Sequence, residues 1–196
     1  MLPKETHRED FYIDETLYHG RPASAAGRLD KEMACYDLLD RLEVPFARAD
    51  HGPAGTIAIC EAVEKVLGEK ICKNLFLRNR QGTQFYLLML DGEKVFKTKD
   101  LSKQLGVARL SFAGEEEMER YLHVSPGSVT VLALMHDTEN HVQLVIDQSI
   151  ARAPRVSCHP CINTSTIWFT TDDLFRKVLP AVGHEPILVD LPDPEA

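Results

Sequence analysis

The stretch "KNLFLRNRQGTQFYLLML", residues 73–90, constrains the fold of this chain more than any other. Its two halves, 73–79 and 83–90, are rich in aromatic and aliphatic residues, and they flank the turn sequence "RNRQG". This pattern predicts a β-hairpin. Similar runs predict a further strand at 108–113, a second hairpin of 128–137 with 141–148, and strands at 165–170 and 186–190.

Amphipathic segments alternate with these strands. In "DKEMACYDLLDRLEVPF", residues 30–46, Asp30 is the expected N-cap, apolar residues recur at helical spacing, and Pro45 ends the helix. The same reasoning predicts a helix between Thr56 and Gly68. Shorter helices are predicted within 98–106, 114–124 and 172–183.

Hairpins interleaved with helices indicate a mixed sheet, in a fold of the α/β (mixed α+β) class. At 196 residues the chain is long enough for one domain with a substantial core. We assign that domain to residues 28–196. Residues 1–27 show no sustained periodicity and include "HGRPASAAG", so we expect an N-terminal extension there.

Charge and hydropathy narrow the functional classes. The sequence has no apolar run of the length that a membrane helix needs, and its first residues are polar, so we expect a cytoplasmic protein without a membrane partner. The net charge of −8 argues against nucleic-acid binding over the whole surface. Residues 65–103 nevertheless carry nine Lys or Arg against four acids, which points to one basic face.

The segment "SCHPCIN", residues 157–163, has the C-x-x-C spacing of a redox dithiol. Such a site needs its first cysteine at an exposed helix N-terminus, whereas the residues after Cys161 are strand-like. A zinc site would need four ligands, and the other cysteines stand singly. We therefore favour neither chemistry. His159 is the remaining candidate, with Asn163 as a polar partner, although a lone histidine is as readily a satisfied surface residue.

Two further segments are candidates for a binding site. In "SPGSVTVLAL", residues 125–134, the Pro-Gly pair predicts a tight turn whose N–H groups either face an anion or simply lead into a strand. Lys73 precedes an apolar strand, where a lysine marks a solvent edge or presents a cation to phosphate or ribose.

Taken together and in order, several segments resemble the YbaK/prolyl-tRNA synthetase-associated editing family, most closely its freestanding members that deacylate Ala-tRNA(Pro), of the PrdX or ProXp-ala type. The resemblance runs from about residue 29 to residue 190. It is carried by "YDLLDRLEVPFARADH", "KNLFL", "LSKQLGVARLSFA", "VSPGSV", "LVIDQSI", "CHPCINTST" and "GHEPILVD".

This resemblance implies a single editing domain with a mixed, largely antiparallel sheet flanked by helices, without metal or cofactor. It implies a pocket for the acceptor end of tRNA(Pro) carrying a mischarged amino acid, with prolyl-tRNA synthetase or an elongation factor as a transient partner. The catalytic residues it implies are Lys73, Gly127, Ser128 and His159. The residues it implies for contacts to the tRNA end are Asn74, Val131, Asp147 and Asn163. Val131 stands where the loop of the family has a proline.

The expected activity is trans-editing, the hydrolysis of mischarged Ala-tRNA(Pro). Alanine fits wherever proline fits, so a second sieve is needed, and we expect apolar residues such as "VLALM" to form its wall. We expect the Gly127 and Ser128 N–H groups to stabilise the oxyanion. Two alternatives stay open: a deacylase for Cys-tRNA(Pro) or another small residue, and a non-catalytic aminoacyl-tRNA binding module.

Overall fold

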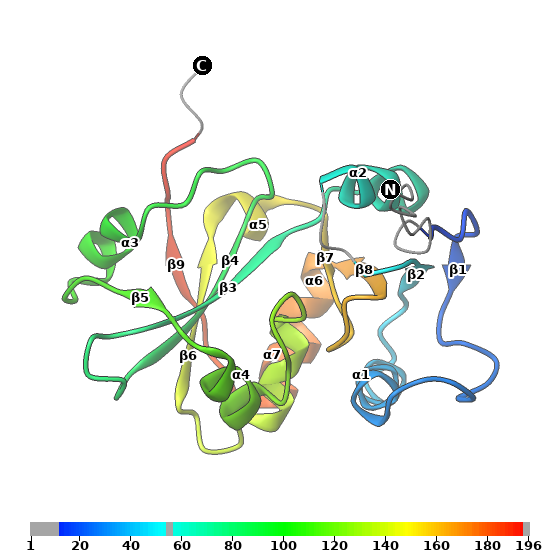
Figure 1. Cartoon of the computed structure of the whole chain (residues 1–196), viewed down its shortest axis with the longest axis horizontal. Helices are drawn as coiled ribbons and strands as arrows, with labels where there is room; N and C mark the ends of the chain where they lie inside the picture. The colour runs from blue at the N-terminus through cyan, green and yellow to red at the C-terminus, as the bar shows by residue number, and fades with distance from the viewer. Residues whose placement is uncertain (1–11, 54–56, 194–196) are drawn as a thin grey trace, which may run out of the picture.

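The structure, a computed structural model, describes residues 12–53 and 57–193 and contains two sheets (Figure 1). The larger sheet has five strands in the order β5-β3-β4-β6-β9. Its strands are β3 (Lys73–Arg78), β4 (Phe85–Leu90), β5 (Ser111–Phe112), β6 (Val142–Asp147) and β9 (Ile187–Val189). The predicted hairpin is confirmed, since β3 and β4 pair antiparallel, whereas β6 runs parallel to both β4 and β9. The predicted mixed sheet is confirmed with it.

The smaller sheet has four antiparallel strands in the order β1-β2-β8-β7. These are β1 (Tyr18–His19), β2 (Ala47–Asp50), β7 (Arg155–Cys158) and β8 (Ser165–Thr170). Only β8 was predicted. Because β1 pairs with β2 and Arg21 forms ion pairs with Asp37 and Asp40, part of the expected N-terminal extension packs on the domain.

The helices cover these sheets. They are α1 (Asp30–Arg41), α2 (Ile57–Leu67), α3 (Thr98–Leu105), α4 (Glu115–Leu122), α5 (Gln148–Arg152) and a continuous segment made of α6 (Thr171–Asp173), the π-helical η3 (Leu174–Val178) and α7 (Leu179–Val182). The predicted helices are confirmed, and α5 was missed. Asp30 is the first helical residue instead of the N-cap, which is Leu29; Thr56 lies outside the described residues. None of the described helices is long and apolar enough to cross a bilayer, which takes about 20 residues.

The prediction of a strand over residues 128–137 was wrong. Residues 131–136 form a 3₁₀ helix, η2 (Val131–His136), so no strand pairs with β6 across "DTEN". The Thr130 side chain accepts a hydrogen bond from the Leu132 N–H and starts the helix. Residues 131–134 are fully buried, and a short apolar run that is buried on all sides has no periodicity that separates strand from helix.

Alternation along the strands of the larger sheet divides the core in two. Phe76, Leu87 and Leu144 face the main core, which includes residues of α1, η2, β7 and β8. Leu77, Leu88 and Val145 face a second cluster beneath α3. Residues 74 and 76 of β3 therefore point toward the smaller sheet, and residues 73, 75 and 77 point away from it.

Candidate active site

A cavity of about 320 Å³ lies where β3, the loop before η2 and the end of β7 meet. Its walls are mostly apolar and include Phe76, Met118 and Val129. The polar groups that reach it come from Asn74, Gly127 and His159, so the structure brings three of the predicted site residues together. A small, largely apolar cavity with a few convergent polar groups is the usual form of a ligand site.

The β7–β8 hairpin holds His159 in place. His159 directly follows β7, and its Nδ1 lies 2.8 Å from the carbonyl oxygen of Ser165, the first residue of β8. Because a carbonyl only accepts, Nδ1 carries the proton and Nε2 keeps its lone pair. Burial lowers the pKa of His159 to about 4, so the ring is neutral near pH 7 and can accept a proton or hydrogen bond at Nε2.

A second histidine stands behind the first. Thr166 Oγ1 lies 3.2 Å from His159 Nδ1 and 2.8 Å from His51 Nε2, while His51 Nδ1 donates to the Gly52 carbonyl at 2.7 Å. His51 Nε2 is therefore the acceptor, and the Thr166 hydroxyl donates to it. Burial lowers the pKa of His51, which keeps this ring neutral. The chain His159–Thr166–His51 thus has one assignment of its protons.

Sequence reasoning missed His51 and Thr166. Thr166 sits in a strand pattern that marks it as an ordinary β-branched residue, and 115 positions separate it from His51. Only the pairing of β2 with β8 brings the two together. Nothing in the local sequence signals that contact.

The predicted tight turn before η2 is present, with Gly127 at φ +84°. The side of Gly127 on which a Cβ would stand faces Asn163, and the Asn163 Nδ2 would lie 3.5 Å from that Cβ. The Ser128 N–H donates to the Ser125 carbonyl at 3.0 Å, and the Ser128 side chain is buried. Within residues 12–53 and 57–193, the Gly127 N–H has no such acceptor. Of the two expected oxyanion donors, only Gly127 is free.

Asn74 presents an unsatisfied acceptor. Its Nδ2 donates to the Cys72 carbonyl at 3.3 Å, whereas Oδ1 is buried without a hydrogen-bond partner in the described part of the chain. An unpaired buried polar atom costs about 1–3 kcal/mol. Since Asn74 lines the cavity, a donor group on a ligand would remove that penalty.

Lys73 and Asp147 lie on the other face of the larger sheet. The exposed Lys73 donates from Nζ to the Lys94 carbonyl at 2.8 Å. Lys94 is buried and forms ion pairs with Asp147 at 3.0 Å and Asp193 at 3.2 Å. Burial alone would raise the pKa of Asp147, but hydrogen bonds from Ser149 and Leu191 and the Lys94 ammonium lower it. The contacts of Asp147 are those of a structural anchor between β6, α5 and the C-terminal segment.

Val131 and the expected "VLALM" wall also lie away from the cavity. Val131 is fully buried at the start of η2 and belongs to the main core. Val129, two residues earlier, contributes to the wall in its place.

The cysteines of "CHPC" are both buried, and every cysteine of the chain is a free thiol. Burial raises the pKa of Cys158. Cys161 Sγ lies 3.5 Å from Cys35 Sγ of α1, and the hydrogen bond from Cys35 lowers the pKa of Cys161. Within the described ranges, no group of three or more His, Cys, Asp or Glu side chains is arranged to hold a metal ion.

Comparison with known proteins identifies relatives of this chain. The model of the aminoacyl-tRNA editing domain matches residues 51–177. The prolyl-tRNA editing protein ProX of Acetoanaerobium sticklandii is 31% identical over 156 residues, which covers 80% of this chain and 94% of that protein. The prolyl-tRNA synthetase associated domain-containing protein 1 of Danio rerio is 30% identical over 172 residues, covering 87% and 91%.

The fold also matches that of a solved structure. The crystal structure of a proposed trans-editing enzyme for prolyl tRNA synthetase superposes with a TM-score of 0.59 at 14% identity, over 84% of this chain and 99% of the other.

Proposed function

This chain belongs to the aminoacyl-tRNA editing domain family, and we propose that it is a trans-editing deacylase that removes alanine from mischarged tRNA(Pro). One observation supports this more than any other. The cavity joins a neutral histidine, a free backbone N–H group and an unpaired amide oxygen on apolar walls. These groups match the needs of ester hydrolysis.

The reacting ester is already activated, so the site needs orientation and charge stabilisation more than a strong nucleophile. The Gly127 N–H binds the carbonyl oxygen as negative charge develops, an effect worth about 3–4 kcal/mol for a well-placed donor. His159 Nε2 accepts a hydrogen bond from the attacking water or from the 2′-hydroxyl of the terminal ribose. Its Nδ1–H stays on the Ser165 carbonyl, which keeps the ring oriented.

The two asparagines position the substrate. The unpaired Asn74 Oδ1 accepts a hydrogen bond from the amino group or a ribose hydroxyl. Asn163 borders Gly127 and closes the loop over the carbonyl. Ser128 acts through the turn, because its N–H holds the Ser125 carbonyl and thereby fixes the direction of the neighbouring Gly127 N–H.

Lys73 remains a proposed contact for the terminal nucleotide. In the described part of the chain its one hydrogen bond goes to a neutral carbonyl oxygen, that of Lys94. A phosphate oxygen is the stronger acceptor for an ammonium group. The exposed side chain of Lys73 can therefore exchange this partner for the nucleotide.

Substrate selection follows from the walls. Phe76, Met118 and Val129 leave a cavity of about 320 Å³ that also has to hold part of the ribose. A methyl group fits there at little cost, whereas the larger proline ring requires the packed walls to move.

The test is deacylation of tRNA(Pro) charged with alanine, cysteine, serine or proline by the purified protein, with His159→Ala as the control. We expect release of alanine and little release of proline. Preferential release of cysteine would show that Cys-tRNA(Pro), instead of Ala-tRNA(Pro), is the substrate, and would refute this part of the proposal. Equal rates on alanine and proline, or no hydrolysis of any charged tRNA, would refute the proposal.

A further inference from the structure

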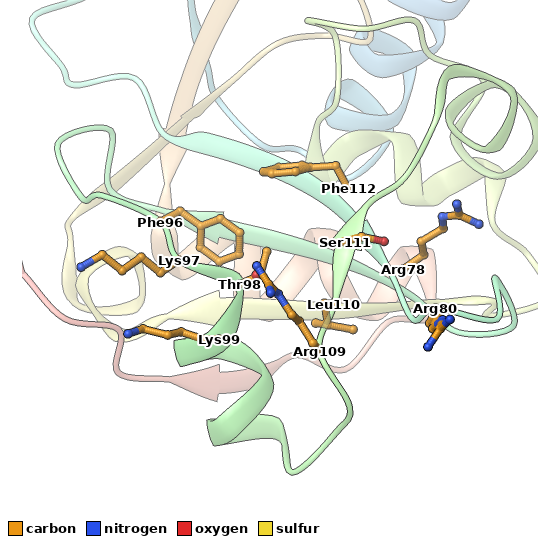
Figure 2. Close-up of a pocket in the computed structure, with 10 residues that line it drawn as sticks. All are labelled: Arg78, Arg80, Phe96, Lys97, Thr98, Lys99, Arg109, Leu110, Ser111 and Phe112. Atoms are coloured by element: carbon orange, nitrogen blue, oxygen red, sulfur yellow. The ribbon is translucent and has the colours of Figure 1, made fainter.

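A second hollow, a groove of about 1040 Å³, runs along β5 at the edge of the larger sheet. Three segments line it: the end of β3 with the following turn, residues 96–99 at the start of α3, and residues 109–112 around β5. Figure 2 shows Lys97 and Lys99 on one side, Arg78 and Arg80 on the other, and Arg109 between them.

Five of the ten lining residues are cations, and none is an acid. Arg78 is paired with Glu117 at 3.2 Å. The other four, Arg80, Lys97, Lys99 and Arg109, are exposed and have no carboxylate partner within the described ranges. Unpaired cations that gather on a protein with a net charge of −8 indicate a site for an anionic ligand.

Two aromatic rings accompany these charges. Phe96 and Phe112 contact each other edge to face, with ring centroids 6.1 Å apart, and 58% of Phe112 is exposed. An exposed aromatic ring among unpaired cations is the combination that binds single-stranded nucleic acid, because bases stack on the ring while phosphates meet the cations.

The groove adjoins the cavity of His159. Phe112 lines both hollows, so a chain that lies in the groove reaches the cavity past this single ring. One end of a polymer bound in the groove would therefore lie next to the cavity that contains His159 and Gly127.

We propose that this groove binds the unpaired 3′-terminal strand of the tRNA, with Arg80, Lys97, Lys99 and Arg109 on its phosphates and a base stacked on Phe112. The proposal rests on the proposed function only in its choice of RNA. An acidic polypeptide would satisfy the cations, but it would have no use for an aromatic ring at the entrance to the cavity.

The experiment measures binding of an uncharged RNA hairpin that carries the tRNA(Pro) acceptor stem and its unpaired 3′ end. A second hairpin lacks the unpaired end. Fluorescence anisotropy gives the Kd of the full chain for each hairpin between about 50 and 200 mM salt.

The test variant is Lys99→Gln with Arg109→Gln. The matched control is Arg41→Gln with Arg176→Gln, which removes the same charge from exposed positions on α1 and η3. We expect the test variant to bind the overhang hairpin about tenfold more weakly, or worse, and to lower the salt slope by about 1.4. The control should stay within about twofold of the unaltered protein.

Phe112→Ala tests the stacking contact and should weaken binding about fivefold or more with little change in salt slope. Equal losses in the test and control variants would overturn the proposal, because overall charge would then explain them. Equal binding of both hairpins would overturn it too, since the unpaired strand would then contribute nothing. A groove variant that binds the acidic polypeptide poly-glutamate more weakly but RNA normally would assign the groove to a protein partner instead.

The groove and the proposed function fail separately. Binding of uncharged RNA requires no hydrolysis, so loss of RNA binding in the groove variant supports the groove even if no charged tRNA is deacylated. Deacylation of Ala-tRNA(Pro) at unaltered rates and affinities in the groove variant would overturn the groove and leave the function intact.

Discussion

Lowering the pH should destabilise the protein through His159. In the folded state the pKa of this ring is about 4, against an ordinary value of 6.5. Between these pH values His159 is protonated in the unfolded chain and neutral in the folded protein. The free energy of unfolding therefore falls as the pH drops from about 6.5 to 4, and it levels off below pH 4. The difference corresponds to about 3 kcal/mol.

Urea unfolding, followed by the fluorescence of Trp168, the one tryptophan, measures the free energy of unfolding at a series of pH values. The comparison is with His159→Asn, whose amide can still donate to the Ser165 carbonyl but does not titrate. His51, buried and with a lowered pKa, contributes with the same sign in both proteins and cancels. The variant should lose about 3 kcal/mol less over this window. Parallel stability curves would refute the assignment of a buried, neutral His159.

Further predictions concern Thr166, Gly127 and Lys73. Thr166→Val leaves His51 Nε2 without a donor and should lower Tm by about 2–12 °C. Deacylation should stay within about threefold of the unaltered rate, because the Ser165 carbonyl still holds His159. Thr166→Ser should restore most of the Tm, and a serine variant as unstable as the valine variant would contradict this prediction. Gly127 has φ +84°, so Gly127→Ala should cost about 1–2 kcal/mol of stability. The variant should also reduce single-turnover deacylation about 100-fold, with RNA affinity unchanged. A lower Tm with a normal deacylation rate would show that this glycine is purely structural. Lys73→Ala should reduce deacylation about tenfold at an unchanged Tm, and normal activity would limit Lys73 to its contact with the Lys94 carbonyl.

The sequence predicted local structure well where a pattern was long and one-sided. The hairpin of β3 and β4 and the amphipathic α1 follow from their own residues. The prediction for residues 131–136 was wrong because the apolar run 131–134 is fully buried and shows no periodicity, and β2 and β7 were missed because four-residue strands carry too little pattern.

The residues of the candidate site, too, were only partly predictable from the sequence. Gly127 and His159 lie in segments with unusual sequences, a Pro-Gly turn and a His-Pro pair, and both reach the cavity. The sequence did not show which of the Gly127 and Ser128 N–H groups is free to bind a ligand. In the folded loop the Ser128 N–H donates to the Ser125 carbonyl. Asp147 fits a strand-end pattern, but its partner Lys94 lies 53 positions away, and only the folded sheet shows that this carboxylate is already satisfied.

The pairing of β2 with β8 also decides when the protein can act during its synthesis. Ala47 pairs with Trp168, and His159 is anchored to Ser165. A nascent chain that has emerged only as far as residue 160 contains the whole hairpin of β3 and β4 and the Gly127 turn, yet it lacks β8. It therefore cannot orient His159 or seat His51. The ribosome must release nearly the entire chain before the cavity has a working histidine, and contacts between such distant segments slow the last step of folding.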